Sequence, residues 1–159
     1  GAALDGAEAA GADGFMVDVW WGLTEPIPKV YRFAAYKELL AMAKARGFKV
    51  QCVASFHRCG GNAGGDDCNI PLPPFVHNAD GIWYRDAQGD DNREYVSLWA
   101  DGAKVGGRTP LEMYSDWFEA FAAEFREDLG GTISEVMVGM GPSGELRYPS
   151  YRPGKWRFC

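Results

Sequence analysis

The sequence predicts an α/β fold in which parallel strands alternate with helices. Short apolar runs rich in β-branched residues, at residues 14–22, 48–56 and 132–141, are typical of buried strands. Two amphipathic segments, at residues 33–47 and 109–131, are typical of helices and lie between these runs. Strands that alternate with helices form a parallel sheet with right-handed crossovers, so the three strands should end at the same edge of the sheet.

The first strand and the first of these helices have clear boundary signals. Glycines bound the run "GFMVDVWWG", and in "FAAYKELLAMAKARG" Arg46 stands in the last turn while Gly47 ends the helix. Apolar side chains recur there at helical spacing, which predicts one buried face. These positions are Phe33, Tyr36, Leu40 and Ala43.

The second strand, "FKVQCVASF", is followed by a long polar segment rich in glycine and proline, from His57 to about Arg108. Thr109 is then expected to cap a helix, with Pro110 as its first residue and Glu112 as the capping-box partner. This helix carries an apolar stripe that predicts core packing, and "TISEVMVGMG" follows it as the third strand. The stripe consists of Tyr114, Trp117, Phe118, Phe121 and Phe125.

Composition favours a folded protein with a neutral partner. The 159 residues, of which 14% are aromatic, are enough for one domain with a hydrophobic core. Sixteen basic and 22 acidic residues give a net charge of −6, which disfavours nucleic acid and anionic membranes as partners. No apolar run has the length of a signal segment or a membrane span. We therefore expect a protein of the cytoplasm or a plastid.

The four cysteines are too few and too unevenly spread to predict a disulfide scaffold, so we expect reduced thiols. A competing interpretation is a metal site formed by His57, Cys59 and Cys68, with Asp66 or Asp67. Zinc sites usually have cysteines closer together than this pair, so we predict no metal and no other cofactor. The cysteines are Cys52, Cys59, Cys68 and Cys159.

Three polar clusters follow the predicted strands, at the edge where ligands bind in parallel α/β folds. Tryptophan rings stack on sugars, while aspartate and histidine hydrogen-bond to hydroxyl groups. The clusters therefore predict a site for a polyhydroxylated neutral ligand. They are Asp18 with Trp20, Trp21 and Glu25; the segment from His57 to Asp67; and Glu145.

Each cluster also has a purely structural interpretation. Asp18 would be a buried carboxylate bonded to nearby backbone, and His57 would cap the loop that follows it. The stretch "GGNAGGDD" is either a flexible insertion or a mobile lid over a ligand. Glu145, in a glycine-lined and partly desolvated position, is a candidate general acid, or else the ion-pair partner of Arg147.

Four stretches of the sequence are distinctive: "VDVWWG" (Val17 to Gly22), "SFHRCGGNAGGDDCNIPLP" (Ser55 to Pro73), "GRTPLEMYSDW" (Gly107 to Trp117) and "GPSGELRYPSY" (Gly141 to Tyr151). Together they resemble motifs of the β-amylases, glycoside hydrolase family 14, and occur in the order found in that family. The resemblance implies a (β/α)₈ barrel, of which residues 1–159 would form roughly the second to fourth β/α units within one catalytic domain. It also implies hydrolysis of α-1,4-glucosidic bonds in starch-like polysaccharides, with release of β-maltose from non-reducing ends and inversion.

The same resemblance implies roles for individual residues. Glu145 matches the general acid, which protonates the glycosidic oxygen, while Asp18 and His57 match residues that hold sugar in the subsites. The stretch "GGNAGGDD" resembles the mobile lid, whose aspartate also reaches the substrate. The stretch from His57 to Asn69 is one residue longer than usual in the family, and alignment from the "NIP" side favours Asp66 for that aspartate, with Asp67 as an alternative.

Arg147 and Tyr151 follow Glu145 closely and are expected to shape the pocket wall around an α-1,4-glucan or maltose. The general base of the family would lie downstream of Cys159, so the alternative function is a glucan-binding or structural protein without turnover. Three strands of a barrel would expose sheet edges and an apolar face. Association with the missing barrel half or with another chain is therefore expected.

Overall fold

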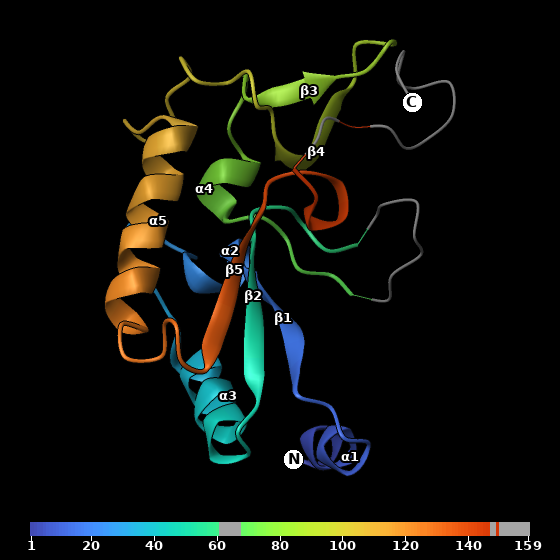
Figure 1. Cartoon of the computed structure of the whole chain (residues 1–159). Helices are drawn as coiled ribbons and strands as arrows, with labels where there is room; N and C mark the ends of the chain where they lie inside the picture. Colours follow the sequence, from blue (N-terminus) through green and yellow to red (C-terminus); the bar gives the residue numbers. More distant parts are fainter. Residues whose placement is uncertain (61–67, 147–148, 150–159) are drawn as a thin grey trace.

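Three parallel strands form the centre of the fold in the computed structural model, which describes residues 1–60, 68–146 and 149 (Figure 1). They are β1 (Gly14–Trp20), β2 (Lys49–Ser55) and β5 (Ile133–Gly139), adjacent in the order β1-β2-β5. Both pairs of neighbours are parallel. The predicted parallel sheet is confirmed, and its strands are slightly shorter than the apolar runs in the sequence.

Helices α3 (Ala34–Ala45) and α5 (Pro110–Glu124) cover one face of this sheet (Figure 1). Their apolar stripes join the strands in one core, as the helical spacing predicted. Phe33, just before α3, contacts three aromatic rings of the α5 stripe, with centroids 5.5–5.9 Å apart. The remaining helices are shorter: α1 (Ala2–Ala9), α2 (Trp21–Thr24), α4 (Pro74–His77) and the 3₁₀ helix η1 (Pro142–Gly144).

The capping box at the start of α5 is present as predicted. The Thr109 hydroxyl accepts a hydrogen bond from the Glu112 N–H at 3.2 Å, and the Glu112 carboxylate accepts one from the Thr109 N–H at 2.7 Å. Pro110 occupies the first helical position, where no backbone N–H is required. Local side-chain chemistry therefore sets the residue at which this helix begins.

The segment from His57 to Arg108 is more structured than its polar composition suggested. It contains α4 and an antiparallel hairpin of β3 (Trp83–Arg85) and β4 (Asp91–Val96). Aromatic side chains anchor the hairpin: the buried rings of Tyr84 and Tyr95 lie 5.9 Å apart. A bridge between His57 and Tyr95 joins the hairpin to the chain that leaves β2. Neither this hairpin nor α4 was predicted from the sequence, and the stretch "GGNAGGDD" lies almost entirely outside the described residues.

The two faces of the sheet differ in how they are covered. Residues Val19, Val50 and Ala54 face the helices and are buried. On the opposite face, 56% of Met16 and 37% of Met137 are exposed. Part of the face opposite the helices is therefore uncovered among the described residues.

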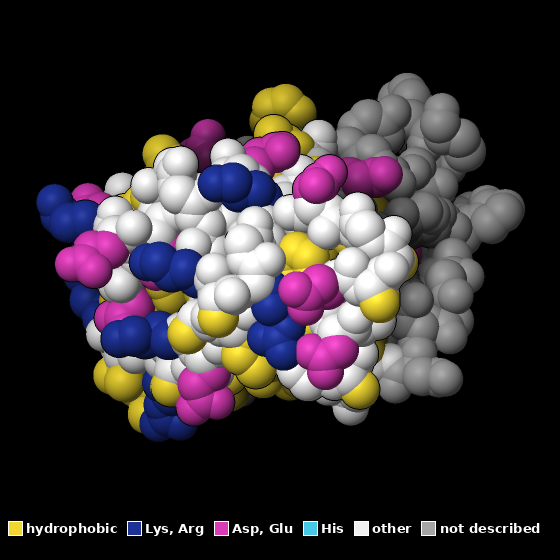
Figure 2. Space-filling model, turned by 60° about the horizontal axis from the view of Figure 1, so that its bottom comes forward, with side chains coloured by type: hydrophobic (Ala, Val, Ile, Leu, Met, Phe, Trp, Pro, Cys, Tyr) yellow, Lys and Arg dark blue, Asp and Glu magenta, His cyan; other side chains and the backbone are white. Residues whose placement is uncertain are grey.

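No helix in the described part of the chain has both the length and the apolar character that crossing a membrane requires. Figure 2 looks at the lower end of the molecule and shows basic and acidic side chains interspersed over it. This end holds the amino-terminal ends of the strands, away from the edge where ligands bind in such folds.

A buried carboxylate, Glu25, links the turn after β1 to the start of α5. Its Oε1 accepts hydrogen bonds from Arg108 Nη2 and from the Lys29 N–H, both at 2.8 Å, and its Oε2 accepts one from Trp21 Nε1 at 2.8 Å. Arg108 also donates to Asp116 of α5 at 2.8 Å. Every accepting oxygen of this fully buried carboxylate therefore has a donor, which offsets the cost of burying its charge.

Replacing Arg108 with alanine should destabilise the fold severely. The substitution leaves the Glu25 carboxylate buried without its charge partner, and such a loss costs roughly 3–5 kcal/mol in the free energy of unfolding. The neighbouring Thr109→Ala removes only a helix cap, at a cost of about 1 kcal/mol. Urea unfolding of both variants would measure these losses. An equal loss of unfolding free energy in the two variants would show that the ion pair of Glu25 and Arg108 does not join the end of β1 to α5.

Candidate active site

Asp18 lies near the carboxyl end of β1, on the face of the sheet that the helices leave open. Its carboxylate Oδ1 accepts a hydrogen bond of 2.7 Å from the Ser55 hydroxyl at the end of β2. Ser55 is fully buried, whereas Asp18 is half-buried. The bond across the two strands holds one carboxylate oxygen at the edge of the sheet, and the side chain keeps access to solvent.

His57 lies beside Trp20, with the two ring centroids 5.0 Å apart. Only 5% of His57 is exposed, and its Nδ1 is buried without a hydrogen-bond partner among the described residues. Burial lowers the pKa of His57, and the nearby negative charge of Asp18 opposes this shift only in part. The imidazole is therefore held in its neutral form at neutral pH, with one nitrogen to donate and one to accept.

The chain leaving β5 passes directly over His57. A Cβ atom added to Gly144 would lie 3.3 Å from His57 Cε1 and 3.9 Å from its Nδ1. Gly144 also has a φ of 76°, a conformation that favours glycine. The residue that follows it is Glu145, so the third predicted cluster lies next to the second.

Glu145 itself is exposed, and the partial desolvation expected for it is not found in the described part of the chain. Among the described residues, the sheet at this edge has three strands. The other residues expected near it, Arg147 and Tyr151, lie outside the described residues, as do Asp66 and Asp67 of the glycine-rich stretch.

Two residues assigned to the first cluster belong to the core instead. Trp21 is fully buried against the rings of Phe56 and Tyr114, and Glu25 is buried in the network with Arg108. The strand ends at Trp20 and α2 begins at Trp21, so the direction of successive side chains changes there. Of the two tryptophans, Trp20 therefore faces the candidate site.

Cys59 and Cys68 form a disulfide, which contradicts the expectation of reduced thiols at these positions. The physical reason is a bridge between Cys59 and Ile70, with backbone hydrogen bonds of 2.9 and 3.2 Å, that brings the two cysteines to a Cα–Cα distance of 5.7 Å. The paired sulfurs are not available as thiolate ligands, so the metal interpretation loses two of its ligands. Cys52 is a free, buried thiol whose pKa is raised to about 11 by burial.

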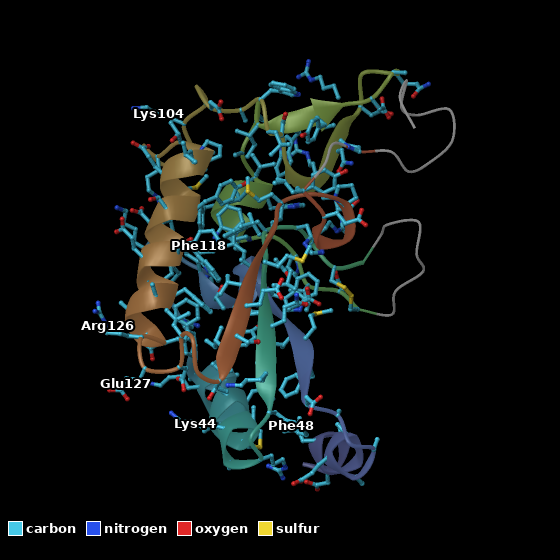
Figure 3. The ribbon with its side chains drawn as sticks, viewed as in Figure 1. Lys44, Phe48, Lys104, Phe118, Arg126 and Glu127 are labelled. Carbon is cyan, nitrogen blue, oxygen red and sulfur yellow. A yellow bond between two sulfur atoms is a disulfide. The ribbon has the colours of Figure 1, made fainter. Side chains whose placement is uncertain are left out.

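A separate pocket of about 260 Å³ lies at the opposite, amino-terminal end of the strands. Lys44, Phe48 and Glu127 contribute to its lining, and Figure 3 shows them at the lower end of the molecule. The lysines there are already engaged, since Lys44 pairs with Asp128 and Lys49 donates to a backbone carbonyl. This pocket is therefore not part of the candidate site.

The arrangement at the carboxyl edge can bind a ligand rich in hydroxyl groups. It offers a carboxylate as acceptor, a neutral imidazole as donor or acceptor, a half-exposed indole ring and a glycine-lined approach to a further carboxylate. Ser55 was not predicted from the sequence. Its place two residues before His57, at the end of a strand paired with that of Asp18, was the available signal.

Comparison with known proteins gives consistent results. The family model of glycosyl hydrolase family 14 matches residues 1–159. The chain is 50% identical over 165 residues to "Beta-amylase 2, chloroplastic" of Oryza sativa subsp. japonica, covering 99% of this chain and 29% of the relative. It is 49% identical to "Beta-amylase 1, chloroplastic" of Arabidopsis thaliana, covering 99% of this chain and 28% of that relative.

A solved structure is similar as well: the catalytic domain of β-amylase from Paenibacillus polymyxa, with a TM-score of 0.78 and 35% identity, covering 94% of this chain and 35% of that one. This similarity shows that the parallel strands and their helices have the fold of part of a (β/α)₈ barrel. The chain spans less than a third of the length of the two plant relatives.

Stability should depend on the titration of His57. Because its pKa is lower in the folded protein than the usual 6.5, the unfolded chain binds a proton more readily as the pH falls. The free energy of unfolding should be retained above pH 6.5 and decrease below it. Urea unfolding would be measured between pH 7.5 and 5.5, about one unit on either side of the ordinary histidine pKa. The free energy of unfolding should decrease more over this range in the wild type than in His57→Gln. Parallel curves for the two proteins would contradict this.

The disulfide should contribute measurably to stability. It closes a loop with a sequence separation of 9 residues, for which loop entropy predicts a contribution of roughly 2–3 kcal/mol. Cys59→Ser should lower the free energy of unfolding by that amount in oxidised samples. A dithiol reductant should destabilise the wild type but leave Cys59→Ser unchanged, and an equal response of both proteins would rule out the bond between Cys59 and Cys68.

Proposed function

The chain belongs to glycosyl hydrolase family 14, and from this premise we propose that it forms part of the catalytic barrel domain of a β-amylase. We propose that the full-length protein hydrolyses α-1,4-glucosidic bonds in starch-like polysaccharides and releases β-maltose from non-reducing ends with inversion. Identity of about half over nearly the whole chain to proteins named β-amylases supports this over a glucan-binding role without turnover.

The observation that carries the proposal is the close approach of Gly144 to His57. It brings the chain that bears Glu145 to the imidazole, which in turn lies beside the tilted ring of Trp20, two residues from Asp18 in β1. Residues far apart in the sequence therefore meet at the carboxyl edge of the sheet. A sugar ring bound at this edge would reach groups from all three strands.

Each residue has a proposed role in that geometry. Glu145 is the general acid, which gives its proton to the glycosidic oxygen as the bond breaks. Asp18 accepts hydrogen bonds from sugar hydroxyls, held by Ser55 for that purpose. His57, neutral because of its burial, exchanges hydrogen bonds with further hydroxyls through its imidazole ring.

Inversion requires a second carboxylate, about 6.5–9.5 Å from the acid, to activate water on the opposite face of the ring. We assign this base to another part of the full-length protein. The support is that 99% of this chain aligns with a relative of which it covers only 29%. Additional strands would also cover the open face that bears Met16 and Met137, and would shield Glu145 from water.

The remaining assignments rest on the resemblance and belong to the same proposal. Asp66 reaches the substrate from the glycine-rich stretch, and Arg147 with Tyr151 shapes the wall beside Glu145. The partner is an α-1,4-glucan or maltose. The word "chloroplastic" in the names of the plant relatives supports a plastid location.

Replacing the proposed acid should abolish turnover while sparing binding. In Glu145→Gln of the full-length protein, maltose release from soluble starch should fall by at least about 100-fold, because an acid that acts in the transition state contributes 10²–10⁴-fold. The affinity for maltose should stay within a few-fold. Initial product from the wild type should be the β-anomer, measured by polarimetry or NMR.

The matched control is Glu119→Gln, which makes the same chemical change at an exposed position of α5. It should retain full activity. Undiminished turnover by Glu145→Gln would remove this residue from the mechanism. A wild type that releases the α-anomer would overturn the inverting reaction itself.

A further inference from the structure

The hydroxyl group of Tyr36 bridges two backbone groups at the carboxyl end of β1. It accepts a hydrogen bond from the Trp20 N–H and donates one to the Asp18 carbonyl, both at 3.0 Å. Tyr36 lies in α3, 16 residues beyond Trp20 in the sequence. One side chain from a helix therefore holds the peptide groups on both sides of Val19.

These backbone groups are not used by the neighbouring strand β2. The Lys49 N–H donates to the Asp13 carbonyl, and the register pairs Gly14 with Lys49, so alternate residues from Asp13 onward bond to β2. The intervening residues, which include Asp18 and Trp20, direct their backbone groups away from β2. Among the described residues, the Trp20 N–H and the Asp18 carbonyl bond to Tyr36 instead.

The Asp18 side chain is held independently from the other side. Ser55 donates to its carboxylate at 2.7 Å, a shorter contact than the 3.2 Å between the same hydroxyl and the Val53 carbonyl. Because a serine hydroxyl has one proton, the shorter, charge-assisted bond to the carboxylate is favoured. Tyr36 thus fixes the backbone of Asp18, and Ser55 fixes its carboxylate.

The chemistry of Tyr36 suits a permanent bridge. Burial raises the pKa of its hydroxyl above the ordinary value of 10.0, so it stays protonated throughout the neutral range and keeps both hydrogen bonds. The bridge also acts on Trp20, whose N–H it accepts and whose ring lies beside His57. One tyrosine therefore holds the backbone of both Asp18 and Trp20.

We propose that Tyr36 and Ser55 are positioning residues that hold Asp18 in the orientation needed to bind sugar hydroxyls. This inference rests on the proposed function, because it assigns Asp18 to the substrate. Neither residue touches the substrate: Tyr36 acts through the backbone between Asp18 and Trp20, and Ser55 acts through the carboxylate. The loss of either bridge weakens sugar binding in the ground and transition states alike, so KM rises more than kcat falls.

The test is a double-mutant cycle on maltose affinity in the full-length protein. Tyr36→Phe removes the bridging hydroxyl and should raise the Kd for maltose by about five-fold, the effect expected from one lost hydrogen bond. In an Asp18→Ala background there is no carboxylate left to position, so the same change should raise Kd by less than about two-fold. A merely structural tyrosine would weaken binding equally in both backgrounds, and that result would overturn the inference.

Tyr84→Phe is the matched control. It removes another buried tyrosine hydroxyl that accepts a backbone N–H, from Leu98 at 3.1 Å, in the hairpin rather than beside Asp18. Its maltose affinity should equal that of the wild type, and a five-fold loss in this variant as well would also overturn the inference. Should Tyr36→Phe fail to fold by circular dichroism, Ser55→Ala enters the same cycle with the same expected non-additivity.

Measurements on the wild type distinguish a failure of the positioning role from a failure of the proposed function. A wild type that releases β-maltose while Tyr36→Phe and Ser55→Ala keep its KM and Kd would refute the positioning role and leave the β-amylase function intact. A folded wild type that neither binds maltose nor hydrolyses starch would refute the function, and the positioning role with it.

Discussion

The fold depends on hydrogen bonds to one buried charge, the carboxylate of Glu25. Glu25 has no exposed surface, and a carboxylate in that position is tolerated only when donors surround it. The donors come from three parts of the chain: the Trp21 indole, the Lys29 backbone and Arg108, 83 residues away. Arg108 lies just before the N-cap of α5, so the network fixes the position of that helix relative to the end of β1. The helix then covers the sheet from one side.

That one-sided covering divides the side chains of the strands into two groups. Alternate residues of β1 and β2 either pack under α3 and α5 or point to the open face, where Asp18 and Ser55 meet. The candidate site therefore needs no special loop to bring its parts together. It results from strands that are parallel and in register, since Asp18, Trp20 and Ser55 lie at the same end of neighbouring strands.

The sequence predicted what local patterns can encode. Apolar runs, helical spacing and the capping box at Thr109 located three strands and two helices, because each signal lies within a few residues of the structure it specifies. The hairpin β3–β4 was missed because its strands are short and irregular in register, and because charged residues surround the buried Tyr84 and Tyr95. The disulfide was missed for a related reason: it depends on the pairing of Cys59 with Ile70, which spacing does not reveal. The hydrogen bonds of Tyr36 and Ser55 join residues 16 to 37 positions apart. The sequence alone does not indicate which distant group a hydroxyl will bond to.

The alternation along β1 also limits how proteins with this arrangement can diverge. An insertion or deletion of one residue between Gly14 and Asp18 would turn the aspartate towards the helices and place an apolar neighbour at the open edge. Changes of chain length are therefore tolerated only beyond the ends of the strands. The number of residues within such a strand determines which side chains face the site. The loops after the strand can vary in length and sequence, and so change which ligands are bound.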